Sequence, residues 1–226
     1  FLEVALMKLG LKVGVYSSPH LIRYNERVRI NGRLLDDQAH IDSFAEIDQK
    51  KTASLTYFEF SRLSALKLFK EANLDVVILE VGLGGRLDAT NIVDSHLAVI
   101  TSIDIDHTDF LGDTREAIAF EKAGICRENC PVVIGEPNVP QTMLDQAEKL
   151  HCQVSRRDVD WSFEQNTENW QWKNKKVRLE NLPFCQIPLA NAATALAAPI
   201  LGSTKFALGS HCAAIETAFL VPFTLI

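Results

Sequence analysis

The chain has 226 residues, a formal net charge of −6 and 47% apolar residues. This balance excludes an intrinsically disordered chain, and the acidic charge argues against a general nucleic-acid binder, which needs a basic face. The most apolar stretch, residues 218–226, is far shorter than the roughly 20 residues of a membrane span, so we expect no membrane contact.

The predicted elements alternate between helices and strands along most of the chain. In chain order, the pattern predicts a helix at residues 1–9, a strand at 12–16, an irregular segment at 17–35, helices at 37–50 and 59–73, strands at 75–81 and 97–103, a helix at 114–123, a strand at 131–135 and a helix at 138–151. The strands at 75–81, 97–103 and 131–135 are continuous apolar runs, typical of strands buried on both faces of a parallel sheet.

Such alternation predicts an α/β fold with a mostly parallel, doubly wound sheet. After Ser155 the pattern changes to three short alternating segments, WSFEQ, NWQWK and KVRLE, which predict a small antiparallel meander. Helical composition returns at residues 189–201 and 210–219. We expect residues 1–220 to form one domain.

Polar clusters follow three of the predicted strands, at residues 17–20, 82–91 and 104–109. In a doubly wound sheet, ligands bind beyond the carboxyl ends of the strands. Glu80 lies at such an end, and a carboxylate there needs a partner. Two interpretations carry equal weight from the residues alone: Glu80 holds Mg²⁺, or it caps a backbone amide or pairs with Arg86.

Other features in these clusters carry less information by themselves. The glycines at 82, 84 and 85 lack the G-x-G-x-x-G spacing, which disfavours a nicotinamide-dependent oxidoreductase, and no G-x-x-x-x-G-K-[ST] phosphate loop occurs. A lone histidine such as His107 is more often structural than a metal ligand. Lys122 alone would be interpreted as a solvated surface charge.

The chain contains five cysteines, which are few, scattered and odd in number. This usage is typical of reduced thiols, so we expect a cytoplasmic protein. Cys126 and Cys130 are spaced C-x3-C, but no second Cys or His pair completes a zinc site.

Several long segments together carry a specific resemblance. SSPHLIRYNERVRING, TYFEF, ILEVGLGGRLDATN, TSIDIDHTDFLGDTREAIAFEKAGI and PLANAATALAA occur in this order. The chain from residue 1 to about residue 200 resembles the bacterial folylpolyglutamate synthase/dihydrofolate synthase family of the Mur ligase superfamily. The last 25 residues match that family poorly.

The resemblance implies the P-loop NTPase-like central domain of an ATP-dependent amide ligase. It further implies dihydropteroate or a reduced folate, L-glutamate and ATP as substrates, Mg²⁺ as cofactor, and a monomer. A carboxylate of the pterin substrate would be phosphorylated by ATP and then attacked by the amino group of glutamate.

The resemblance also assigns residues to roles. It implies Ser17 (or Ser18, if the alignment slips by one), Glu80 and His107 as metal ligands and Lys122 as a carbamylated lysine. His107 would be an unusual ligand, because Mg²⁺ prefers oxygen. It implies that one wall of the pterin site consists of Thr56, Tyr57, Phe58 and Glu59, that the other consists of Leu87, Asp88 and Ala89, and that Asn191 contacts adenine.

Two departures from the family pattern matter for activity. The phosphate loop that should precede Phe1 is absent, and the chain stops at residues 221–226, which would begin a linker to a further domain. We therefore expect the chain as printed to bind nucleotide poorly and not to complete the reaction. The rival interpretation is a catalytically dead remnant that still binds pterin or nucleotide.

Overall fold

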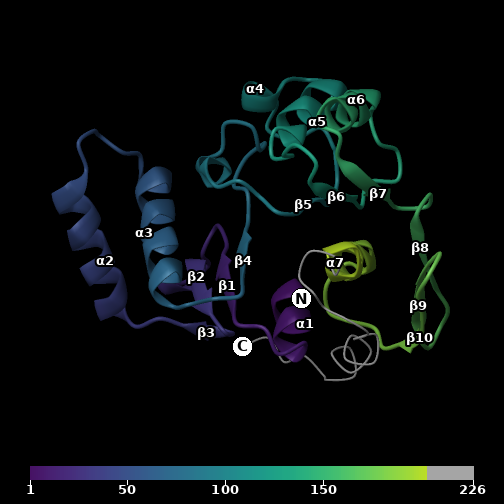
Figure 1. Cartoon of the computed structure of the whole chain (residues 1–226), viewed down its shortest axis with the longest axis horizontal. Coiled ribbons are helices and arrows are strands. Elements are labelled where there is room, and N and C mark those ends of the chain that lie inside the picture. Colours follow the sequence, from purple (N-terminus) through teal and green to yellow (C-terminus); the bar gives the residue numbers. More distant parts are fainter. Residues whose placement is uncertain (203–226) are drawn as a thin grey trace.

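The computed structural model describes residues 1–202 (Figure 1). The helices are α1 (Leu2–Lys8), η1 (Tyr24–Arg27), α2 (Asp37–Lys50), α3 (Tyr57–Glu71), η2 (Ala89–Ile92), α4 (Thr108–Leu111), α5 (Arg115–Ala123), α6 (Gln141–Lys149) and α7 (Leu189–Gly202). The strands are β1 (Val13–Tyr16), β2 (Val28–Ile30), β3 (Arg33–Leu34), β4 (Val76–Leu79), β5 (Ala98–Ile100), β6 (Pro131–Ile134), β7 (Gln153–Arg156), β8 (Trp161–Gln165), β9 (Trp170–Asn174) and β10 (Arg178–Leu182). The helix expected at 210–219 and the boundary expected at residue 220 lie outside the described residues.

The α/β class and the small antiparallel meander are confirmed, with the strands divided among three sheets. A mixed sheet has the order β3-β2-β1-β4, a parallel sheet the order β5-β6-β7, and the meander the order β10-β9-β8. In the described part of the chain the predicted sheet is divided, because no ladder there joins β4 to β5. The polar clusters after β4 and β5 therefore follow strands of different sheets.

The segment at 17–35, expected to be irregular, contains a hairpin. Strand β2 pairs antiparallel with β1 and with β3. Asn31 and Gly32 form the two-residue turn, with φ of 50° and 73°. Asn-Gly is the strongest short hairpin signal because both residues tolerate positive φ, so this feature was readable from the sequence.

Strand β4 is shorter and less buried than its apolar run predicts. It spans Val76–Leu79, and Val77 is 40% exposed. Among the described strands β4 lies at an edge of its sheet, whereas β6 is central in its own sheet and buried at every residue. Apolar sequence therefore identified the strand, but its place in the sheet determines its burial.

Two hydrophobic clusters pack on opposite faces of β6. Val132 and Ile134 belong to a cluster with α5 and α6, whereas Val133 belongs to a cluster with the meander tryptophans and α7. Figure 1 shows α5 and α6 on one side of the parallel sheet and α7 on the other. Side chains alternate along a strand, so one strand anchors both layers. No helix among residues 1–202 is long and apolar enough to cross a membrane.

Candidate active site

Glu80 lies directly beside the serine-rich segment that follows β1. The parallel pairing of β1 with β4 places the Glu80 backbone N–H 2.9 Å from the Tyr16 carbonyl, and the Ser18 N–H donates to Glu80 Oε2 at 2.8 Å. The Ser17 hydroxyl points elsewhere, since Arg29 Nη1 donates to its Oγ at 3.1 Å. Glu80 therefore accepts from a backbone amide, that of Ser18, as in the capping interpretation that the sequence left open.

The segment after β4, residues 82–94, is called the β4 loop below. Asp88 organises its first half: one carboxylate oxygen accepts from the N–H groups of Gly82 and Leu83 at 3.1 and 3.3 Å. The other oxygen accepts from the N–H and hydroxyl of Thr90 at 2.8 and 2.6 Å. Arg62 of α3 adds an ion pair at 3.0 Å, and the Asp88 side chain is 6% exposed. Asp88 thus holds the loop in shape.

The middle of the β4 loop packs tightly on the end of α5. The Arg86 N–H donates to the Glu121 carbonyl at 2.8 Å, and the two side chains form an ion pair at 2.9 Å. A Cβ added at Gly124 would lie 2.3 Å from the Arg86 Cβ, and one added at Gly85 would lie 2.9 Å from the Glu121 carbonyl oxygen. Glycine at both positions permits this approach, which brings Lys122 to the loop.

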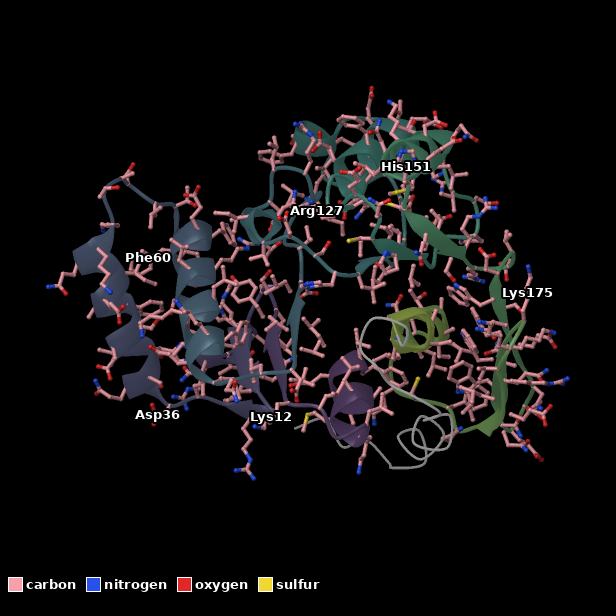
Figure 2. All side chains as sticks on the ribbon, viewed as in Figure 1. Lys12, Asp36, Phe60, Arg127, His151 and Lys175 are labelled. Atoms are coloured by element: carbon pink, nitrogen blue, oxygen red, sulfur yellow. The ribbon has the colours of Figure 1, made fainter. Side chains whose placement is uncertain are left out.

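Arg127 anchors the end of the β4 loop. Its Nη2 donates to the carbonyl and to the side-chain oxygen of Asn91, at 2.7 and 2.9 Å, and Figure 2 labels it beside this loop. Its Nε pairs with Asp94. Three ion pairs involving Arg62, Arg86 and Arg127 therefore connect the β4 loop to α3, α5 and the segment after α5.

Lys122 lies between the β4 loop and the segment after β5. A Cβ at Gly85 would lie 3.3 Å from the Lys122 Cα, and the nearby Asp106 carboxylate favours the charged amine. Burial has the larger effect and lowers the pKa of Lys122 below its usual value. Lys122 is thus a half-buried amine with a raised neutral fraction, unlike the solvated charge that sequence alone indicates.

The segment after β5, residues 104–112, is called the β5 loop below. Ile103, the residue before this loop, is held at both backbone polar groups. The Ile103 N–H donates to Glu136 Oε2 at 3.1 Å, and Arg115 Nε donates to the Ile103 carbonyl at 3.0 Å. His107 itself is 59% exposed, 3.6 Å from the Asp106 carboxylate, with a left-handed φ of 52°. Such a φ is costly for a non-glycine residue and is found often at functional sites.

The predicted metal ligands do not form a preformed cage. Within residues 1–202, no three His, Cys, Asp or Glu side chains are grouped closely enough to hold a metal ion. The site has two parts: Ser18 donates to Glu80, and Asp106 lies near enough to Lys122 to act on its charge. The oxygen donors of the first group suit Mg²⁺ better than the imidazole of His107 does.

The first predicted pterin wall is the start of α3. Thr56 and Glu59 form its capping box: Glu59 Oε2 accepts from the N–H and hydroxyl of Thr56, at 2.7 and 2.8 Å, and these bonds lower the pKa of Glu59. Tyr57 and Phe58 are about half exposed. The structure assigns Thr56 and Glu59 a helix-capping role and leaves the aromatic pair available at the surface.

Arg62 connects the two predicted walls and was missed by sequence reasoning. Its guanidinium pairs with Asp88 of one wall and lies 5.5 Å from the ring centroid of Phe58 of the other. Leu87 and Ala89 flank Asp88 in the chain. Leu87 is 79% exposed, and Ala89 begins η2. A charged residue on the buried face of a predicted helix was the available signal.

Asn191 lies in the first turn of α7, and its side chain is exposed. One turn further on, Thr194 contacts the carboxyl end of β6, because a Cβ at Gly135 would lie 2.2 Å from the Thr194 hydroxyl. Residues three apart share a helix face, so Asn191 lies on the face of α7 that carries Thr194, one turn from the carboxyl end of β6. Ligands are expected at this end of the strands.

Comparison with known proteins agrees with this geometry. Residues 35–208 match the Mur ligase middle domain. The chain is 85% identical over 197 residues to the dihydrofolate synthase/folylpolyglutamate synthase of Haemophilus influenzae (87% of this chain, 45% of the relative), and 57% identical over 198 residues to that of Escherichia coli (87% and 47%).

Solved structures of bacterial folylpolyglutamate synthase/dihydrofolate synthases also superpose on this chain. An E. coli FolC complex with DHPP and ADP superposes with a TM-score of 0.91 at 51% identity, covering 99% of this chain and 53% of that one. A bifunctional folylpolyglutamate synthase/dihydrofolate synthase with Mn, AMPPNP and L-glutamate gives 0.89 at 54% identity, covering 99% and 54%. The chain spans about half the length of the curated relatives it matches. It belongs to the Mur ligase family and carries that family's middle domain.

Proposed function

We propose that the full-length protein is an ATP-dependent ligase that adds L-glutamate to dihydropteroate, to reduced folates or to both. The observation that carries this proposal is the position of Lys122, a half-buried amine between the β4 and β5 loops with a lowered pKa. The names of the relatives support the substrate class, and the complexes with ADP, AMPPNP and L-glutamate support the co-substrates.

The chemistry requires activation, because a carboxylate does not react with an amine at neutral pH. A carboxylate oxygen of the pterin substrate attacks the γ-phosphorus of ATP, and ADP leaves. The amino group of glutamate then attacks the acyl carbon, inorganic phosphate leaves, and a proton from the amine is released. Cationic groups stabilise the charge on the transferring phosphoryl group.

The donor set after β1 and β4 fits Mg²⁺. Glu80 supplies carboxylate oxygens, and Ser17 or Ser18 supplies a hydroxyl, in keeping with the preference of this ion for oxygen. In the proposal His107 adds an imidazole from the β5 loop. When bound, the ion supplies charge stabilisation for phosphate oxygens.

Lys122 acts in this proposal as a carbamate. Its neutral amine attacks the carbon of dissolved CO₂, a C–N bond forms, and one proton passes to solvent. The product is an anion with two oxygens, which suits a position beside a cation, whereas an ammonium would be repelled. The lowered pKa of Lys122 supports this step because only the neutral amine reacts.

The substrate sites follow from the same proposal. Tyr57 and Phe58 offer aromatic faces to a flat pterin, with Thr56, Glu59, Leu87, Asp88 and Ala89 around it, and Asn191 contacts adenine. We further propose that residues 1–220 form one ATP-binding domain and that the protein is a cytoplasmic monomer. Sedimentation of the purified protein tests the last point.

The decisive experiment supplies the full-length protein with dihydropteroate, L-glutamate, ATP and Mg²⁺. We expect ADP, phosphate and the glutamyl conjugate to form in equal amounts, measured by coupled assay and mass spectrometry. Omission of glutamate is the control. Binding of the pteridine without any conjugate would support the remnant interpretation instead.

A further inference from the structure

Arg62 occupies an unusual position for a guanidinium. Its side chain is 5% exposed, and its charged carbon lies 5.5 Å from the ring centroid of Tyr16 and 5.5 Å from that of Phe58. Its Nη2 pairs with Asp88 at 3.0 Å, while its Nε is buried and has no hydrogen-bond partner. The guanidinium therefore contacts two aromatic rings and one carboxylate.

Stability alone is a poor explanation for this arrangement. Removing two charges from water costs free energy that their attraction often fails to recover, and an unpaired buried N–H adds to that cost. An apolar residue of similar volume would fill the same space between the two rings. The charge has one further effect: it holds Asp88, whose four remaining hydrogen bonds shape the β4 loop.

Phe58 is the member of this group that faces outward. It is 52% exposed, whereas Tyr16, the other ring beside Arg62, is fully buried. Arg62 thus contacts one exposed ring and one buried ring. An exposed phenylalanine without such a contact would sample several rotamers, and a ligand that stacks on it would have to order it.

We propose that Arg62 is a positioning residue for the pteridine ring of the substrate. This proposal rests on the proposed function, and it adds how the two walls of the substrate site are set relative to each other. Arg62 restrains the ring of Phe58 through the cation–π contact and holds the loop carrying Leu87 through Asp88. A single side chain thereby determines the spacing into which a flat heterocycle fits.

The test uses Arg62→Met and Arg62→Lys in the full-length protein, with Lys51→Met as the matched control. Lys51 also pairs with a carboxylate, that of Asp48, and lies 5.7 Å from an aromatic centroid, that of Phe60. Lys51 follows the last residue of α2 and is not among the residues proposed to line the substrate site. Circular dichroism first establishes that each variant is folded, and Arg62→Lys carries the test if Arg62→Met does not fold.

We expect both Arg62 variants to raise KM for the pteridine substrate by about 10-fold or more, with less effect from lysine, because the contact between the guanidinium and Phe58 is lost. KM for ATP and kcat should change by less than about 3-fold, because Arg62 acts only on the pteridine site. A general loss of folded enzyme would instead lower the apparent kcat and leave the pteridine KM unchanged. The control should match the wild type. An unchanged pteridine KM, or equal rises in both KM values, would overturn the proposal.

Direct binding separates this proposal from the proposed function. Dihydropteroate affinity is measured by equilibrium dialysis without ATP. Wild-type protein that binds it but forms no product would contradict the ligase function, and the Arg62 variants would still decide the positioning role by their affinity. The same dialysis is run with a reduced folate, and wild-type protein that binds neither compound would contradict both proposals.

Discussion

The β4 loop and the β5 loop carry the two halves of the candidate site, yet they are held very differently. Ion pairs through Arg62, Arg86 and Arg127 connect the β4 loop to its surroundings, and Asp88 binds its backbone. The β5 loop beyond Ile103 has mainly local contacts, such as the N–H of His107 to Asp106 at 2.7 Å. The side of the candidate site that carries Glu80 and the proposed pterin walls is thus preformed, while His107 is left exposed.

Lys122 connects these halves, so its replacement should have the largest effect. We expect Lys122→Ala to abolish ligation in the full-length protein, and added acetate to restore part of it by supplying a carboxylate. Lys122→Arg should not restore activity, because arginine keeps its charge and cannot form a carbamate. Product formation by mass spectrometry measures all three. Full activity of Lys122→Arg would show that the amine chemistry is not used.

The difference in anchoring predicts different stability costs for equivalent substitutions. Asp88→Ala leaves Arg62 buried without its partner and should cost about 3–5 kcal/mol of unfolding free energy. Asp106→Ala in the β5 loop removes a carboxylate that is 79% exposed and should change stability very little. Urea denaturation of the two variants side by side measures the contrast. Equal losses would mean that the β4 loop is no better held than the β5 loop.

Glu80 should matter for turnover and hardly at all for folding. Glu80→Gln keeps the size and one acceptor for the Ser18 N–H but removes the charge that would hold the cation. We expect kcat to fall about 100- to 1,000-fold, as for loss of a group that stabilises transition-state charge. The unfolding free energy is the control and should stay unchanged. Metal affinity, measured by calorimetry, should fall together with kcat. Near-normal turnover would support the amide-capping interpretation of Glu80.

The smallest predicted effect concerns the pH dependence of stability, to which the buried His40 of α2 contributes. His40 of α2 is 3% exposed, both its ring nitrogens lack partners, and burial lowers its pKa, against the opposing charges of Asp37 and Asp36. The unfolded chain therefore binds the proton more readily than the folded protein, so stability should fall as pH drops below about 6.5.

His40→Phe should remove part of this pH dependence. We expect the difference in Tm between pH 7.5 and pH 5.5 to shrink, because the aromatic contacts with Tyr24 and Phe44 survive while the titrating group is lost. His96→Gln, at an exposed position, is the control and should behave as the wild type. An unchanged Tm difference in His40→Phe would show that His40 does not titrate on unfolding.

Much of the local structure could be predicted from the sequence. The helix predicted at 37–50 coincides with α2, and the strand predicted at 131–135 contains β6. The meander tryptophans alternate as expected, with Trp170 and Trp172 buried. These successes share a cause: periodicity, caps and apolar runs are local, and burial of a continuous pattern leaves few alternatives.

The candidate site was predictable only as a set of strand ends. The order of the motifs indicated Glu80, His107 and Lys122, but not that Ser18 contacts Glu80. The capping box of Thr56 and Glu59 was readable from its T-x-x-E spacing, although the resemblance assigned both residues to a substrate wall. Arg62 was missed because its partner, Asp88, lies 26 positions away in the chain. Contacts at such distance depend on how helices and strands pack, which propensity does not determine.

The sequence by itself determined the α/β class, the positions of most helices and strands, and the family resemblance. The tertiary structure alone decided that β4 and β5 belong to different sheets, that Lys122 is a half-buried amine, and that the buried guanidinium of Arg62 joins the two proposed substrate walls. The reason is physical: hydrogen bonds within a helix or turn act over a few residues, whereas burial, pKa and ion pairing depend on neighbours that only the folded chain brings together.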